Sequence, residues 1–424
     1  MRTSGALLRI AMALGGLIPG LALAVGPWQV PPLLALAAFG LAVWCAATML
    51  GWAVEVAELD IAGALALALV AIVALLPEYV VDVLLAYKAG ADPSRIPEAS
   101  ANMNGATRLV IGLGLPLVVL LGLRRQRRRA QSPQASGLSP LQAKPPRFAS
   151  LEIPAEQRSI QAFAVLASLV AMLGVATGRI HIILGLVLIL VFAFFLWHAS
   201  QGEVEEPELV GVAEVIGALA KRRRWTVITA MFVLAAVTIL LVADPFVESL
   251  RSVGEQFGLP NYLLIQWLAP LASEAPEFII ALTLAAHGRT AAAVAMLTTA
   301  VVNQWSALVG SLPIAFKLGG GGWALPLTME SGRQMQEFAL TASLTLLVIA
   351  FLVSLRIPSW ACWYILASFV AEFALPDRHA RLTVAAVNGA VALVMLVIHA
   401  RHLPQLVTEP LRVFRSRRKA VSAS

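Results

Sequence analysis

Two carboxylates flank a proline in the middle of a long apolar stretch of the sequence. The segment LASEAPEF, residues 271–278, contains Glu274, Pro276 and Glu277. An acidic side chain at the centre of a membrane helix costs about 2.5–3.5 kcal/mol even on the more lenient insertion scale. A proline there removes a helix hydrogen bond and leaves a backbone carbonyl without its donor. Oxygen ligands for a hard cation such as Na⁺ or Ca²⁺ would explain both features.

A second segment has the same pattern nearer the start of the chain. LLPEYVVD, residues 75–82, contains Pro77, Glu78 and, four residues after the glutamate, Asp82. Residues spaced by three or four positions share a helix face, so the two acids of each segment point the same way. Carboxylates that converge in a low dielectric repel one another, and some must hold protons when no cation is bound. This chemistry suits the exchange of cations for protons.

An amide follows each Pro-Glu dipeptide at the same distance. Asn104 lies 26 residues after Glu78, and Asn303 lies 26 residues after Glu277. The two copies align at an offset of 199 residues. We predict that these four residues bind the cation. The further polar candidates for the site are neighbours of the same motifs: Asn102, Ser273, Gln304 and Ser306.

Each candidate residue also has a purely structural interpretation. Buried amides serve as hydrogen bonds between membrane helices, and Glu78 or Glu277 would serve a structural role if paired with Arg108. Arg108 lies one helical turn after Asn104. We expect its guanidinium to tune the charge of the site by neutralising Asp82 or Glu78, which would favour a monovalent cation and protons over Ca²⁺. Pro77 and Pro276 are expected to distort their helices and turn backbone oxygens inward.

The elements that position these residues are membrane helices. The chain has 424 residues, of which 59% are hydrophobic and 13% charged, against about 25% charged in soluble domains; its mean hydropathy is +0.83. This composition predicts an all-α polytopic membrane protein. We expect about twelve transmembrane helices, at residues 7–25, 32–54, 61–87, 100–123, 160–178, 180–198, 225–243, 261–286, 290–316, 336–355, 358–375 and 381–400.

The positive charge is concentrated in short clusters between the apolar segments. RRQRRR at 124–129, KRRR at 221–224 and RSRRK at 415–419 are typical of cytoplasmic loops and tails. This placement predicts cytoplasmic N- and C-termini, and it argues against a nucleic-acid partner; the expected location is a bacterial plasma membrane. The basic run at 377–381, predicted to be external, does not fit. The cysteines and histidines show no metal-ligand spacing, so no cofactor is expected beyond the transported cations.

The two Pro-Glu segments belong to the third and eighth predicted spans and therefore run in opposite directions. Inverted repeats with a site near the membrane midplane are typical of secondary transporters. We predict two inverted five-helix repeats with peripheral helices. The expected division is a peripheral helix at 1–30, a first repeat at 31–200 with a basic linker at 124–158, a cytoplasmic loop at 201–223, a second repeat at 224–400 and a basic tail at 401–424. Gly90 and Gly288 align within one position and are expected to end their helices in turns.

These residues resemble a known family. LLPEYVVD followed by ANMNGATRLVIGLG, and LASEAPEF followed by VVNQWSALVGSLP, are similar to the two α-repeats of the sodium/calcium exchanger family, in the cation/Ca²⁺ antiporter superfamily. Bacterial members are often called sodium:proton or sodium:calcium exchangers. The resemblance implies a secondary antiporter of Na⁺, Ca²⁺ or H⁺ that works by alternating access, and it implies that the Pro-Glu and Asn-bearing helices form the central site.

Two further classes of function are compatible with the sequence. A degenerate transporter acting as a scaffold or sensor would retain the fold without exchange, and the charge of Arg108 favours this alternative. The second alternative is an intramembrane enzyme. The sequence contains no HExxH motif, and hydrolysis does not require an acid that recurs in both halves of the chain. We therefore expect a transporter rather than an enzyme, with inorganic cations and the lipid bilayer as partners. The sequence defines no oligomeric state.

Overall fold

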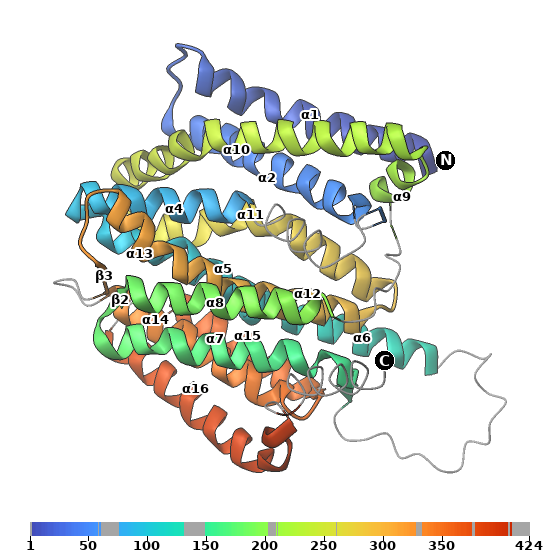
Figure 1. Ribbon diagram of the computed structural model, residues 1–424, viewed down its shortest axis with the longest axis vertical. Coiled ribbons are helices and arrows are strands. Elements are labelled where there is room, and N and C mark those ends of the chain that lie inside the picture. Colours follow the sequence, from blue (N-terminus) through green and yellow to red (C-terminus); the bar gives the residue numbers. More distant parts are fainter. Residues whose placement is uncertain are drawn as a thin grey trace, which may run out of the picture. The chain divides into compact units, whose positions relative to one another are not determined.

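The computed structural model describes residues 2–57, 59–60, 76–130, 149–201, 209, 211–259, 261–327, 333–374, 378–405 and 408 (Figure 1). Most of them are helical. The α-helices are α1 (Arg2–Val25), α2 (Pro32–Ala57), α4 (Leu76–Ala91), α5 (Ala101–Arg108), α6 (Leu115–Ala130), α7 (Arg158–Thr177), α8 (Ile182–Ala199), α9 (Val212–Gly217), α10 (Lys221–Phe257), α11 (Asn261–Ala286), α12 (Thr290–Asn303), α13 (Val309–Leu318), α14 (Arg333–Leu352), α15 (Ser359–Ala374) and α16 (Arg378–Ile398).

Short segments of other geometry connect these helices. The strands are β1 (Ser150–Glu152), β2 (Arg179–His181), β3 (Ala324–Pro326) and β4 (Arg356–Pro358). The 3₁₀ segments are Pro93–Ser100, Ala155–Gln157 and Ala400–His402, and the π-helical segments are Leu109–Gly114 and Gln304–Leu308. Each π segment continues directly from an α-helix that carries one of the predicted asparagines.

Within the described residues, ten helical segments are long and apolar enough to cross a membrane. This confirms the all-α membrane fold, while the count of twelve stays a prediction. The third predicted span begins outside the described residues. The eleventh corresponds to α15, which has only 16 residues.

Helix α10 is much longer than the span that we predicted at 225–243. It has 37 residues, about 55 Å at 1.5 Å per residue, and it continues through Pro245. The extra turns bury one apolar face, with Phe246, Val247 and Leu250 in the core. Packing of this face outweighs the cost of the proline.

The chain forms two compact units, and each contains segments from both repeats. The first comprises residues 1–106, 193–277 and 311–325. In it α2 packs along α10, and α4 packs against both (Figure 1). The core shared by α2, α4, α5, α10 and α11 includes Phe39, Val43, Val81, Leu85, Ala101, Phe246, Ile265 and Ala269.

The second unit comprises residues 107–192, 278–310 and 326–424. Helix α14 packs against α16 and α7, α12 packs against α6 and α7, and α15 packs against α6. Strands β1 and β4 form an antiparallel pair with Leu151 opposite Ile357. This unit contains the residues from Thr107 to the end of α6, and therefore Arg108.

The two aligned glycines have different roles, so one of the two predicted turns is wrong. Gly288 follows α11 with a φ of 92°, a conformation that favours glycine. Gly90 lies inside α4, and a β-carbon on it would approach the backbone oxygen of Phe316 to 2.1 Å. Close packing of two backbones, rather than a turn, explains Gly90.

Candidate cation-binding site

The acids of the first repeat lie on the buried face of α4. Glu78 is 3% exposed and Asp82 is fully buried. Pro77, just before Glu78, is also buried. The preceding part of the predicted span, residues 61–75, lies outside the described residues. Two carboxylates thus enter the core of the first unit from one helix.

Asp82 is held by neutral donors from the segment that carries the asparagines. Asn102 Nδ2 donates a hydrogen bond to Asp82 Oδ2 at 3.0 Å, and the Met103 backbone N–H donates to Oδ1 at 3.2 Å. Asn104 Nδ2 donates to the Ser100 carbonyl at 2.9 Å. Within the described chain, no hydrogen-bond donor reaches the side-chain oxygen of Asn102 or of Asn104. Both amides therefore use their donors to hold their position and leave an oxygen for a cation.

Helix α5 lies directly against α11 beside Asn104. A β-carbon on Gly105 would come within 1.6 Å of the Gln266 carbonyl oxygen. Pro270 follows four residues later, so its missing N–H leaves that carbonyl without its helical donor. Glycine is the residue that permits this approach, because any side chain would collide with the backbone of α11.

The acids of the second motif follow on the same helix. Glu274 is 3% exposed, Ser273 is buried and Glu277 is half-buried. The Ser273 hydroxyl lies 3.4 Å from the carbonyl of Ala269. Helix α11 continues through Pro276, where the proline removes one backbone donor, and the distortion of the helix stays a prediction.

Asn303, Gln304 and Ser306 are buried in the second unit. Ser306 donates its hydroxyl proton to the Val302 carbonyl. Asn303 ends α12, and the π-helical turn begins at the next residue. These three candidates occupy the same short segment, as expected from their spacing in the sequence.

The π-helical turns are a shared feature that the sequence did not indicate. The Val309 N–H donates to the Gln304 carbonyl, and in the first repeat the Leu115 N–H donates to the Val110 carbonyl. Both bonds span five residues. Such turns occur often at functional sites because they shift the register of side chains along a helix. Neither segment contains a residue pattern that distinguishes π from α geometry.

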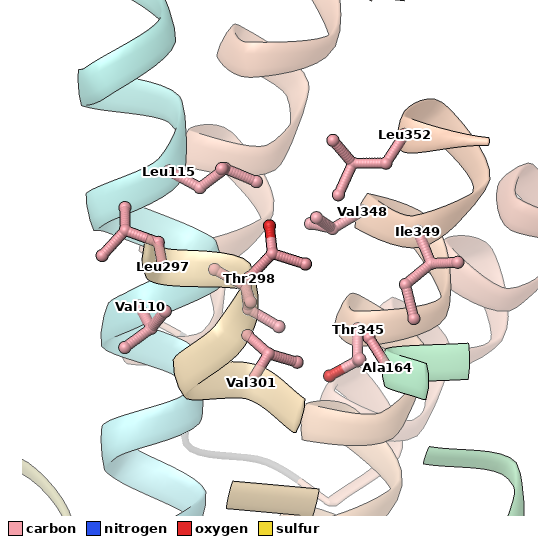
Figure 2. A pocket seen from close by; sticks show the side chains of 11 residues that line it. Val110, Leu115, Ala164, Leu297, Thr298, Val301, Thr345, Val348, Ile349 and Leu352 are labelled. Carbon is pink, nitrogen blue, oxygen red and sulfur yellow. The ribbon is translucent and has the colours of Figure 1, made fainter. Parts of the chain in front are cut away.

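Within the second unit, helix α12 packs against Leu109–Gly114, the π-helical segment that follows α5. Figure 2 shows an apolar cavity at this contact, with Val110 and Leu115 facing Leu297 and Val301. Its volume is about 10 Å³, close to the space of one water molecule. The hydroxyls of Thr298 and Thr345 already donate to backbone carbonyls. This cavity has no oxygen set for a cation.

Arg108 has carboxylate partners that its sequence position did not indicate. Its Nη1 lies 2.6 Å from Glu337 Oε2, and its Nε lies 3.4 Å from Glu372 Oε2. The tuning of Asp82 or Glu78 by Arg108 stays a prediction. Glu337 and Glu372 are acids within apolar spans, and the criterion that selected Glu78 would have selected them too.

Across the described residues, no group of three or more His, Cys, Asp or Glu side chains is arranged to hold a metal ion. Amide and backbone carbonyl oxygens are further ligands for hard cations. Ca²⁺ accepts such mixed oxygen sets, with six to eight ligands. Asp82 and the Asn102 amide that donates to it supply oxygens of this kind.

Buried acids and amides on proline-containing helices, in a chain of apolar spans, define an integral membrane transporter. The sequence matches the sodium/calcium exchanger protein family over residues 30–201 and 227–400. The chain belongs to this family, as its motifs predicted. No curated protein matches the sequence.

Two solved structures have a similar fold. The crystal structure of the H⁺/Ca²⁺ exchanger CAX is 29% identical to the chain and has a TM-score of 0.85, with 98% of each chain covered. The structure of native YfkE is 15% identical and has a TM-score of 0.59, with 90% of this chain and 99% of YfkE covered. The similarity extends over nearly the whole of both chains.

Proposed function

We propose that the protein is a secondary active cation antiporter that exchanges Ca²⁺ for H⁺ by alternating access. Membership of the exchanger family and similarity to an H⁺/Ca²⁺ exchanger support this function. The observation that carries it is the arrangement around Asp82. A fully buried carboxylate whose donors are neutral, one of them the Asn102 amide with an oxygen that accepts no hydrogen bond, lacks only a positive charge, which either a cation or a proton supplies.

The proposed site takes its ligands from both repeats. Glu78 and Asn104 from the first repeat, with Glu277 and Asn303 from the second, are the principal ligands. Asp82, Asn102, Ser273, Glu274, Gln304 and Ser306 complete the set. The equal spacing of the two motifs and the packing of Gly105 against α11 support a shared site. Protons replace the cation on the carboxylates, because buried acids near one another cannot all stay ionised without it.

The proposal includes the predicted orientation, with both termini cytoplasmic in a bacterial plasma membrane. It also includes the division into repeats at 31–200 and 224–400. Arg381 was part of the basic run at 377–381 that contradicted the orientation. Its Nη1 lies 2.7 Å from Glu337 Oε1, and its side chain is 8% exposed. A buried, paired arginine does not act as a free loop charge, so the objection is weaker.

The test is exchange in reconstituted vesicles that contain the full chain. An imposed proton gradient should drive Ca²⁺ uptake, followed with an enclosed calcium indicator, and a parallel sodium gradient tests Na⁺ as the exchanged ion. Glu277→Gln should abolish the flux because a principal ligand of the site can then no longer exchange a proton for the cation. Glu152→Gln, which changes an exposed acid on β1, is the matched control and should keep full activity.

Two outcomes would contradict the proposal. A fully active Glu277→Gln variant would refute the assignment of the site. Absence of any Na⁺- or H⁺-driven flux in the correctly folded wild type would favour a degenerate transporter that serves as a scaffold or sensor.

A further inference from the structure

Four buried charged residues from four helices meet in the second unit. Arg108 ends α5, Glu337 lies on α14, Glu372 on α15 and Arg381 on α16, and all are at most 7% exposed. Their formal charges sum to zero. We call these residues the charge quartet. Burial of four charges is costly unless their partners are well placed, so the geometry of each member indicates its role.

Glu337 is the best-satisfied member of the quartet. Its Oε2 lies 2.6 Å from Arg108 Nη1, and its Oε1 lies 2.7 Å from Arg381 Nη1. Each carboxylate oxygen thus has its own guanidinium. Arg108 Nη2 also donates to the backbone carbonyl of Glu337. This acid is held in its ionised form from two sides.

Glu372 is the least-satisfied member. The Arg108 Nε–H donates to Thr341 Oγ1 at 2.9 Å, so it is not directed at Glu372 Oε2, which lies 3.4 Å away. Neither oxygen of Glu372 accepts a hydrogen bond from any residue that the structure describes. An ionised carboxylate without donors in a buried position is strongly disfavoured. Protonation removes that cost but leaves the quartet with one excess positive charge, so neither state of Glu372 is strongly favoured over the other.

Among the residues that the structure describes, the charged groups around Glu372 are the other members of the quartet. Arg108, Glu337 and Arg381 face it from α5, α14 and α16. Helix α6 also packs against α15, with Gly112, just before α6, touching Phe369. The first basic residue of α6, Arg124, lies 12 residues beyond Gly112, about 18 Å along the helix. Arg356 lies on β4, before the start of α15 at Ser359, and the 13 helical steps from Ser359 to Glu372 alone span about 20 Å.

Three members of the quartet lie close to one end of their helices, whereas Arg108 lies within the continuous helical span at residues 93–128. Glu337 is four residues after the start of α14, Glu372 is two residues before the end of α15, and Arg381 is three residues after the start of α16. These offsets correspond to about 6 Å or less at 1.5 Å per residue. A proton from water at that end has a short path to Glu372.

We propose that Glu372 is a proton-binding site, separate from the cation ligands, that reports the pH at this end of the membrane to helix α5 through Arg108. A proton from water binds one carboxylate oxygen of Glu372. With Glu372 protonated, Arg108 keeps its bonds to Glu337 and Thr341, as in the structure. When Glu372 loses the proton, its negative charge attracts the Arg108 guanidinium, which lies one turn after Asn104 on the same helix. The transport consequence of this site depends on the proposed antiporter function, whereas proton binding itself does not.

Infrared difference spectra of the purified full-length protein between high and low pH test proton binding directly. The carbonyl stretch of a protonated carboxylic acid should appear at low pH, and Glu372→Gln should remove one such band. Glu152→Gln is the control, because an exposed acid has a different environment and the Glu372 band should persist. A Glu372→Gln spectrum that keeps every band of the wild type would overturn the proposal.

Thr341→Val provides a second test that keeps all four charged residues. It removes the acceptor of the Arg108 Nε–H, which can then donate to Glu372 and stabilise the ionised form. The Glu372 band should therefore appear only at lower pH than in the wild type; an unchanged transition contradicts the coupling through Arg108.

In vesicles, Glu372→Gln should keep cation exchange but lose one step of its pH dependence. Retained exchange with an unchanged pH profile refutes only this inference, whereas absence of exchange in the wild type refutes only the proposed antiporter.

Discussion

Asp82 in the first unit and Glu337 in the second are both buried acids, but their partners differ in charge. Asp82 is fully buried and receives hydrogen bonds from the Asn102 amide and the Met103 backbone. Glu337 is 2% exposed and lies against the guanidiniums of Arg108 and Arg381. One carboxylate has dipoles around it, and the other has two full positive charges.

This difference supports the proposed binding role of Asp82 and a structural role for Glu337. Neutral donors orient Asp82 without cancelling its charge, so a cation or proton still has a carboxylate to bind. The charge of Glu337 is already compensated within the protein, and a further cation would be repelled by the adjacent guanidiniums. Burial of an acid in a membrane helix is therefore insufficient to identify a transport site, and the charge of its partners decides.

Removal of the charge on Glu337 should have the largest effect on stability. Glu337→Gln leaves two buried guanidiniums with one carboxylate, and breaking a buried ion pair in this way costs about 3–5 kcal/mol. We expect a large fall in the thermal unfolding temperature of the detergent-purified protein.

The double variant Glu337→Gln/Arg381→Gln is the matched control, because it restores the neutrality of the quartet. It should recover part of the lost stability. If Glu337→Gln is as stable as the wild type, or if the double variant is less stable than the single one, charge balance does not hold these helices together.

Asp82→Asn should have the opposite effect to Glu337→Gln: transport should be lost, whereas stability should change little. The asparagine keeps one acceptor for the two neutral donors and removes a buried charge, so the unfolding temperature should stay near that of the wild type. Proton-driven Ca²⁺ uptake in vesicles should fall at least about tenfold, which corresponds to about 1.4 kcal/mol. An active Asp82→Asn, or one that unfolds like Glu337→Gln, would remove the distinction between the two acids.

Local spacing explains why the transport motifs were predictable from the sequence. Glu78 and Asp82 share a face because they are four residues apart on one helix, and the pattern recurs 199 residues later. The helical fold follows from composition in the same way. Neither prediction requires knowledge of which helices touch.

The charge quartet was not predictable because its contacts are not local. Arg108 and Glu337 are 229 residues apart, and no periodicity connects them. We therefore expected Arg108 to pair with Asp82 or Glu78, the acids nearest to it in the repeat. The prediction for Gly90 was wrong for a similar reason, because its constraint comes from the Phe316 backbone and not from its own turn.

The smallest expected effect belongs to a third paired acid, which lies at a helix end. Asp60 follows α2, and its two oxygens accept hydrogen bonds from Arg224 Nε and Nη2 at 2.7 and 2.6 Å. The hydrogen bond from Arg224 lowers the pKa of Asp60 below its ordinary value, against a smaller opposing effect of burial. Because the pKa is lower in the folded state, the pair stabilises the protein above the unfolded pKa of about 3.9. That stabilisation is lost as the pH falls through the folded pKa.

Asp60→Asn should therefore lower stability at neutral pH by about 1 kcal/mol or less, since ion pairs near water are weak. The difference in unfolding temperature between the wild type and this variant should shrink as the pH falls from 7 to below about 4. Glu152→Gln is the control, because Glu152 and Arg356 form an ion pair whose side chains are about 70% exposed, and it should have a still smaller effect. A difference for Asp60→Asn that is constant with pH would show that the charge of this pair is irrelevant. Paired acids would then stabilise this fold only where, as for Glu337, they are withdrawn from water.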